Sequence, residues 1–210
     1  MDLILITSVI NIVGDPLSYI KTRSVYNKQQ RFEQTLITIE SLSKINAKKI
    51  LFIEASNIPE YELELISKVD IYKNIYKNDH IKKIIDGPHK SIGESLSVLE
   101  GINGVDLSLY DNIYKISGRY YLTDKFDYHL WNNEHTIFYN DLKQDILLTS
   151  FYKINCKQYD EWIYLLENIY KNKNKESIEI IFRKQFKNYK SIESLGVAGY
   201  ISVNGVYWEN

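Results

Sequence analysis

The stretch that decides the fold is Asn112–Asp127, which reads N-I-Y-K-I-S-G-R-Y-Y-L-T-D-K-F-D. Its first half is rich in β-branched and aromatic residues, which predicts a strand that breaks at Ser117-Gly118 and leaves Arg119 at its end. Glycine lets the backbone approach a ligand closely, and a guanidinium offers forked donors that suit phosphate. Because open α/β sheets bind ligands at the carboxyl ends of their strands, we expect these three residues to contact a diphosphate. They also fit a buried strand that is followed by a turn glycine and a surface arginine.

The 210 residues suffice for one domain with a sizeable core, and we expect a single domain over 1–210. The formal net charge is −1, so nothing attracts nucleic acid over long range, and no nucleic-acid partner is expected. Cys156 is the only cysteine, which excludes an intrachain disulfide. No apolar run approaches the length of a membrane span, and the N-terminus lacks the basic region of a signal peptide.

Arginine is scarce in this chain, which holds 26 lysines and arginines together. Only four are arginines, at Arg23, Arg31, Arg119 and Arg183. Such a skew toward lysine is typical of an AT-rich genome. An arginine kept against that bias is a candidate for a task that lysine performs less well, such as bidentate binding of phosphate.

Before and after the central strand, the pattern alternates between strands and helices. Apolar runs at 3–13, 48–56 and 69–76 predict further strands, and 3.6-residue periodicity predicts helices at 31–45, 59–68 and 90–102. Four strand–helix units in sequence predict an α/β fold with a mostly parallel twisted sheet and helices on both faces. After residue 127 we expect short strands at 136–139 and 146–152, helices at 159–170 and 176–186, and a strand or hairpin near 195–208.

Polar side chains stand where the predicted strands end. Thr7 and Ser8 interrupt the first apolar run, Glu54 ends the second strand, and Lys90-Ser91 opens the helix before the central strand. Hydroxyls and a carboxylate can bind a base or ribose, and a helix N-terminus can meet an anion. Each also has a simpler interpretation, namely local hydrogen bonds to the backbone, a loop carboxylate, or an ordinary helix cap beside a solvated lysine.

A long connection over 14–30 carries Lys21, Arg23 and Lys28. Connections of this length in compact domains are usually functional or disordered. It either folds over an anionic ligand, with Arg23 in contact, or is a solvated surface excursion.

Five stretches carry a resemblance to small glycosyltransferase-like proteins of large DNA viruses and some bacteria: P-L-S-Y-I-K-T-R-S-V-Y, R-F-E-Q-T-L, K-S-I-G-E, S-G-R-Y-Y-L and L-G-V-A-G-Y-I-S-V-N-G. More broadly, the polar residues after the strands resemble the nucleotide-sugar-binding half of GT-A glycosyltransferases. This resemblance implies a nucleotide-sugar donor bound by about 1–127 and a glycan or glycoprotein acceptor on the side of about 128–210. It also implies transfer of a hexose or deoxyhexose.

The chain departs from the GT-A pattern because it contains no Asp-x-Asp, the motif that typically holds Mn²⁺ or Mg²⁺ on the diphosphate. We expect Arg119, with Lys115, Lys90 or Arg23, to neutralise the leaving diphosphate instead. The four histidines lack the spacing of metal ligands. No cofactor is therefore assigned; a divalent metal stays open, and weak or absent metal dependence is the expectation.

An inverting GT-A enzyme needs a carboxylate base for the acceptor hydroxyl, and the resemblance points to the start of a helix in the second half. Glu176 and Glu179 fit that place, with Glu179 preferred because it lies inside the apolar-periodic run; both also fit solvated helix carboxylates. The alternatives are a non-catalytic GT-A-like protein that binds glycan or serves a structural role, and a sugar nucleotidyltransferase. The latter is disfavoured because no G-x-G-x-R follows the first strand. We expect a cytoplasmic location, or the host-cell cytoplasm if the chain is viral.

Overall fold

The computed structural model describes residues 1–46, 48–174 and 176–210. Its strands are β1 (Asp2–Ser8), β2 (Lys48–Glu54), β3 (Ile71–Asn74), β4 (Asn112–Ser117), β5 (Tyr120–Leu122), β6 (Ile137–Asp141), β7 (Ile146–Leu147), β8 (Phe151–Asn155), β9 (Lys190–Ile192), β10 (Val197–Tyr200) and β11 (Tyr207–Glu209). Its α-helices are α1 (Lys28–Ser41), α2 (Pro59–Lys68), α3 (Asp79–Ile85), α4 (Lys90–Ile102), α5 (Tyr128–Trp131), α6 (Tyr159–Lys171) and α7 (Ile178–Gln185).

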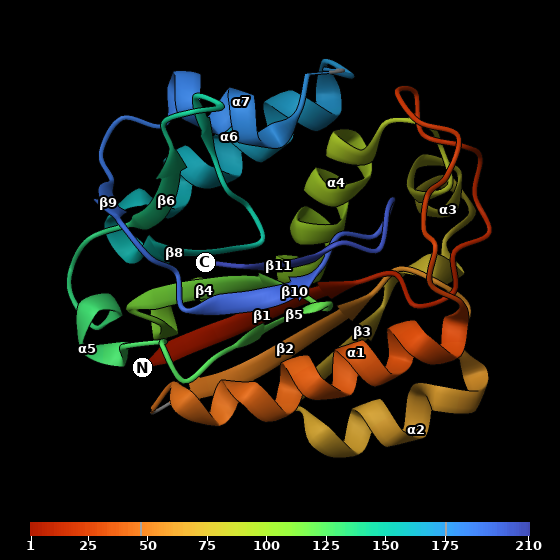
Figure 1. The fold of residues 1–210 in the computed structure, drawn as a ribbon, viewed down its shortest axis with the longest axis horizontal. Helices are drawn as coiled ribbons and strands as arrows, with labels where there is room; N and C mark the ends of the chain where they lie inside the picture. Colours follow the sequence, from red (N-terminus) through yellow and green to blue (C-terminus); the bar gives the residue numbers. More distant parts are fainter. Residues whose placement is uncertain (47, 175) are drawn as a thin grey trace.

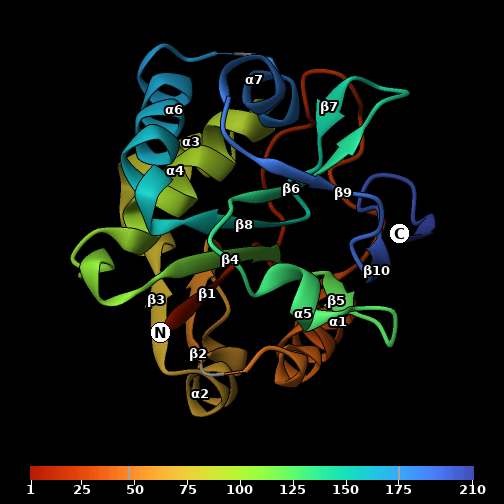
Figure 2. The same ribbon diagram turned by 90° about the vertical axis from the view of Figure 1, so that its left-hand side faces the viewer.

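Within these described ranges the main sheet has eight strands in the order β3-β2-β1-β4-β8-β6-β7, with β9 paired to β6. The first four are parallel neighbours, and β8 joins β4 in the antiparallel direction. Helices α1 and α2 cover one face, and α3, α4, α6 and α7 cover the other (Figures 1 and 2). The predicted α/β architecture with helices on both faces is thereby confirmed.

The strands are buried on both faces, which explains their nearly continuous apolar sequences. In β1, Leu3 and Leu5 belong to the core on the α4 and α6 side, whereas Ile4 and Ile6 belong to the core on the α1 and α2 side. All four side chains are fully buried. Successive side chains of a strand point to opposite faces, so one apolar run supplies both cores.

Several helix ends follow their local sequence signals. The N-cap of α1 is Asn27, whose side chain accepts a hydrogen bond from the Gln30 amide while the Gln30 side chain accepts one from the Asn27 amide. This reciprocal arrangement is a capping box and starts the helix three residues before the predicted position. Pro59 opens α2, as predicted, because it lacks the amide hydrogen that a helix start leaves unpaired.

Three segments differ from the expectations. The first strand ends at Ser8 rather than at 13, and the predicted strand over 146–152 divides into β7 and β8. The sequence pattern did not predict α3, α5 or β9 as separate elements. From 9 to 27 the chain is irregular and runs beside the turn between α3 and α4, where the Asp15 amide donates to the Asp86 carbonyl at 2.9 Å.

A second sheet of three strands, in the order β11-β10-β5, packs against α1 through β5. Its strands come from the segment that follows β4 and from the C-terminal part of the chain, so residues 119–122 and 197–209 are neighbours in space. Among the described residues, no helix combines the length and the apolar character needed to span a membrane.

Candidate functional site

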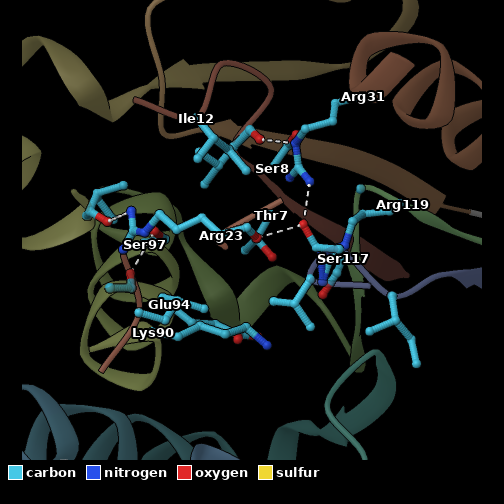
Figure 3. A pocket seen from close by; sticks show the side chains of 18 of the residues that line it. Thr7, Ser8, Ile12, Arg23, Arg31, Lys90, Glu94, Ser97, Ser117 and Arg119 are labelled. Carbon is cyan, nitrogen blue, oxygen red and sulfur yellow. Dashed lines mark hydrogen bonds between the residues drawn. The ribbon is translucent and has the colours of Figure 1, made fainter. Parts of the chain in front are cut away.

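A cavity lies where the connections between strands change from one face of the sheet to the other. Helix α1 follows β1 on one face, whereas α4 precedes β4 on the opposite face, and β1 and β4 are neighbours. The two connections therefore leave a crevice at the carboxyl ends of these strands, where open α/β sheets bind ligands. The crevice is a cavity of about 260 Å³ (Figure 3). Its lining includes Thr7, Ser8, Ile12, Arg23, Arg31, Lys90, Glu94, Ser97, Ser117, Gly118, Arg119, Tyr120, Ile201, Ser202 and Val203.

The Ser117-Gly118 break forms the floor of this cavity. The Gly118 amide donates to the Thr7 carbonyl at 2.9 Å, and the Gly118 carbonyl accepts a hydrogen bond from Thr35 Oγ1 at 3.0 Å. A Cβ atom at this position would lie 3.1 Å from Ser8 Cβ and 3.4 Å from Thr35 Oγ1. The packing of the strand end against α1 thus favours glycine at this position, independently of any ligand.

Arg119 follows on the same strand end and lines the cavity. Its Nε is buried and makes no hydrogen bond within the described part of the chain. The guanidinium lies 5.4 Å from the centre of the Tyr120 ring, and no carboxylate of the described residues forms an ion pair with it. Because the guanidinium lines the cavity and has no hydrogen-bond partner among the described residues, it is free to bind an acceptor that enters.

Three of the four arginines in the sequence line the cavity, namely Arg23, Arg31 and Arg119. Arg31 Nε donates to the Val9 carbonyl at 2.7 Å, and its Nη1 donates to Ser202 Oγ at 3.1 Å. Burial lowers the pKa of Arg31 to about 9, and the charge of Arg119 adds to this effect. Arg31 therefore fixes two walls of the cavity and adds positive charge.

Arg23 has a similar double role. Its Nη1 donates to the Ile85 carbonyl at 3.0 Å and its Nη2 donates to the Gly87 carbonyl, which joins the irregular segment to the turn before α4. Its Nε is buried without a partner among the described residues. Desolvation lowers the pKa of Arg23, and the nearby carboxylate of Asp86 opposes that shift.

A buried ion pair lies at the inner end of the cavity. Lys115, fully buried on β4, donates from Nζ to Glu94 Oε1 at 2.5 Å, to Ser117 Oγ at 3.0 Å and to the Thr149 carbonyl at 3.0 Å. An ammonium has three donors, and all three are used here, so Lys115 has none left for a ligand. Burial raises the pKa of Glu94, but Lys115, Lys90 and Arg119 outweigh it and hold that pKa below its usual value.

Lys90 and Glu179 extend this network. Desolvation lowers the pKa of Lys90, but the carboxylates of Glu94 and Glu179 outweigh it and raise that pKa. Glu179 Oε1 accepts a hydrogen bond from Thr149 Oγ1 at 2.8 Å. Lys90 lines the cavity, whereas Glu179 is not one of the residues that line the cavity.

The structure thus brings together Thr7, Ser8, Arg23, Lys90, Ser117, Gly118 and Arg119 of the residues predicted from sequence. The other four do not line the cavity. Glu54 is fully buried and accepts hydrogen bonds from the Ile10 amide and from Ser56. Ser91 donates to the Asn174 carbonyl at 3.3 Å, and Glu176 pairs with Lys184 at the surface.

Sequence reasoning did not place Arg31, Glu94 or the wall formed by 201–203 in the site. Glu94 lies one turn after Lys90 on α4, so the i, i+4 spacing could have placed it on the same face. For Arg31, the available signal was the scarcity of arginine in the sequence. The wall at 201–203 has no local signal, because its contacts join residues about 170 to 180 positions apart, such as Arg31 with Ser202.

The described residues offer no evident set of ligands for a divalent metal. No group of three or more His, Cys, Asp or Glu side chains among the described residues is arranged to hold a metal ion. Within the cavity, the carboxylate of Glu94 is already paired with Lys115. The side chains present therefore do not fit the metal that an Asp-x-Asp motif holds in GT-A enzymes.

Comparison with known proteins bears on the fold. No protein-family model and no curated protein matches the sequence. Among solved structures, an active-site mutant of LgtC is similar, with a TM-score of 0.51, 9% identity, and 88% of this chain and 70% of that chain covered. A second is a glycosyltransferase involved in the glycosylation of the major capsid of PBCV-1, with a TM-score of 0.43, 7% identity, and 80% of this chain and 67% of that chain covered. A third is CTP:phosphocholine cytidylyltransferase (LicC) from Streptococcus pneumoniae, with a TM-score of 0.49, 13% identity, and 96% of this chain and 95% of that chain covered. The likeness to LgtC confirms the predicted GT-A-like fold.

Proposed function

We propose that this chain is a glycosyltransferase that moves a sugar from a nucleoside-diphosphate sugar to a glycan or glycoprotein acceptor. One observation carries the proposal: Arg119 follows the end of β4 at the switch point of the sheet and lines the cavity with a guanidinium that pairs with no side chain of the described residues. With Arg23, Arg31 and Lys90 it makes the lining strongly cationic, against a single lining carboxylate. Such a lining suits a diphosphate and stabilises the negative charge that develops on a leaving group.

The proposal assigns the residues as follows. Thr7, Ser8 and Ser117 offer hydroxyls to the nucleotide, and Arg119 with Lys90 holds the diphosphate without a metal. Residues of about 1–127, together with the wall at 201–203, bind the donor, and the rest of about 128–210 faces the acceptor. Glu179 remains the candidate base for an inverting reaction, because it is close enough to the lining residue Lys90 to raise its pKa, although it does not itself line the cavity.

Thermal-shift screening against UDP-, GDP- and TDP-sugars tests the proposal. We expect one nucleotide series to raise the melting temperature, and the matching sugar nucleotide to release its nucleoside diphosphate in the presence of acceptor. Arg119→Ala should abolish the stabilisation, because it removes the unpaired guanidinium from the lining of the cavity. Arg183→Ala is the matched control, since Arg183 pairs with Asp145 away from the cavity and should leave binding unchanged.

The other outcomes identify the alternatives. Release of pyrophosphate from a nucleoside triphosphate and a sugar phosphate would indicate a nucleotidyltransferase. Stabilisation by glycans without any effect of nucleotides would indicate a non-catalytic binding protein. An Arg119→Ala variant that binds nucleotide as well as the wild type would refute the assignment of the diphosphate site.

A further inference from the structure

Glu94 is an anomaly in this cavity, because it is the carboxylate in a lining otherwise charged by arginines and a lysine. A carboxylate repels phosphate, and although Glu94 is the partner of the buried Lys115, that pairing occupies only one of its two oxygens. Nevertheless its side chain is 12% exposed, and it faces Arg119 across the cavity in Figure 3. The ligand group that suits this carboxylate is one that is neutral and can donate hydrogen bonds.

The carboxylate is also held in place. Oε1 accepts the hydrogen bond from Lys115 at 2.5 Å, and Lys115 is fixed in turn by Ser117 and the Thr149 carbonyl. Oε2 accepts no hydrogen bond from the described residues and is not sealed from the cavity. One oxygen is thus anchored while the other is free to accept, which is the arrangement of a recognition group rather than of a mobile surface side chain.

The pair with Lys115 also keeps Glu94 ionised. Three cations surround the carboxylate, and together they outweigh its desolvation. An ionised carboxylate only accepts hydrogen bonds, and its bonds to hydroxyls are stronger than those between neutral groups. A sugar offers several hydroxyl donors, whereas a diphosphate at neutral pH offers only acceptors.

From these observations we propose that Glu94 binds the hydroxyls of the transferred sugar and selects neutral sugars against uronic acids, with Lys115 as its positioning residue. This inference rests on the proposed function and adds the class of sugar to it. The cationic groups Arg119 and Lys90 bind the diphosphate, and Glu94 marks the sugar end of the same donor. A donor whose sugar carries a carboxylate would bring two negative charges together in a desolvated site.

The test compares wild type, Glu94→Gln and the matched control Glu100→Gln, which changes a carboxylate on the same helix that does not line the cavity. Affinities are measured by calorimetry for UDP, UDP-glucose and UDP-glucuronate, or for GDP, GDP-mannose and GDP-mannuronate if the screen selects guanosine. For thymidine the pair is TDP and TDP-glucose. The readout is the ratio of affinities between the sugar nucleotide and the free diphosphate, which a loss of folding does not change.

We expect Glu94→Gln to bind the free diphosphate at least as well as the wild type, because a repulsive charge is lost. The advantage of the neutral sugar nucleotide should fall about tenfold, as expected for losing one hydrogen bond to a charged acceptor. Discrimination against the uronate should fall by a similar factor, and Glu100→Gln should match the wild type.

Two results would overturn the inference. One is an unchanged ratio in Glu94→Gln, and the other is an equal weakening of diphosphate and sugar nucleotide, which would make Glu94 a support for the cations only. If the wild type binds no nucleoside diphosphate, the proposed function itself fails and this inference fails with it. If the diphosphate binds and only the ratio is insensitive to Glu94, the selection of the sugar alone is refuted.

Discussion

Replacing Glu54 by glutamine should change how the stability of the protein depends on pH. Glu54 is fully buried behind the cavity, and burial raises its pKa from the ordinary 4.5 to about 7, although hydrogen bonds from Ser56 and Ile10 oppose the shift. The folded state therefore keeps a proton on Glu54 between about pH 4.5 and pH 7, where the unfolded chain has lost it. A folded state that binds more protons loses stability as the pH rises.

The magnitude follows from the two pKa values. One pKa unit corresponds to about 1.36 kcal/mol, so ionising Glu54 lowers the free energy of unfolding by about 2 to 3 kcal/mol between pH 5 and pH 8. Glutamine does not titrate in this range. Its amide nitrogen replaces an oxygen, Oε2, that has no hydrogen-bond partner among the described residues, which costs stability at every pH. The variant should therefore be less stable than the wild type at pH 5 and recover about 2 to 3 kcal/mol of that deficit by pH 8.

Urea unfolding followed by tryptophan fluorescence at pH 5 and pH 8 measures this difference, with equal slopes against urea as the check on two-state behaviour. Glu40→Gln is the control, since it removes an exposed carboxylate from α1 and should behave like the wild type at both pH values. A wild-type-to-variant difference in unfolding free energy that is the same at pH 5 and pH 8 would show that Glu54 is ionised in the folded protein throughout, and the reasoning would be refuted.

Two other outcomes are expected. Lys115→Met should lower the free energy of unfolding by about 3 kcal/mol, because it leaves the Glu94 carboxylate buried without its partner. Adding Glu94→Gln should restore at least half of the loss. Losses that are additive in urea titrations would contradict this expectation. Sugar transfer should survive treatment with EDTA, since Arg23, Arg31, Arg119 and Lys90 supply the positive charge of the cavity and no group of metal ligands is found among the described residues. Activity that disappears with EDTA and returns with Mn²⁺ would show that a metal site was overlooked.

The fold was predictable where local signals and the global arrangement agree. Pro59–Lys68 and Lys90–Ile102 are helices with the predicted bounds, because a proline at the first turn and a clear apolar period mark them. The division of 146–152 into β7 and β8 was not predictable from periodicity. Thr149 and Ser150 are the polar residues of this run, but residues of this kind also occur inside strands, so they do not by themselves mark a break. The break at 148–150 is fixed by pairing with β6 and β4.

The site was predictable as far as it follows from strand ends. Thr7 and Ser117 meet because parallel strands bring their carboxyl ends to one edge of the sheet. Glu54 also ends a strand, but β2 lies one strand away from the switch point, and its carboxylate turns to the Ile10 amide instead of the cavity. The partners of Arg31 are set by tertiary packing alone, so no local pattern contains them.

The walls of the cavity come from stretches near residues 7–31, 85–97, 117–120 and 201–203. No fragment that contains only one or two of these stretches can hold the ligand, so the binding-competent state is the fully folded one. A ligand that binds there should stabilise the cooperative folding of the whole molecule, and amide hydrogens far from the cavity, as in β2 and α6, should exchange more slowly when it is bound.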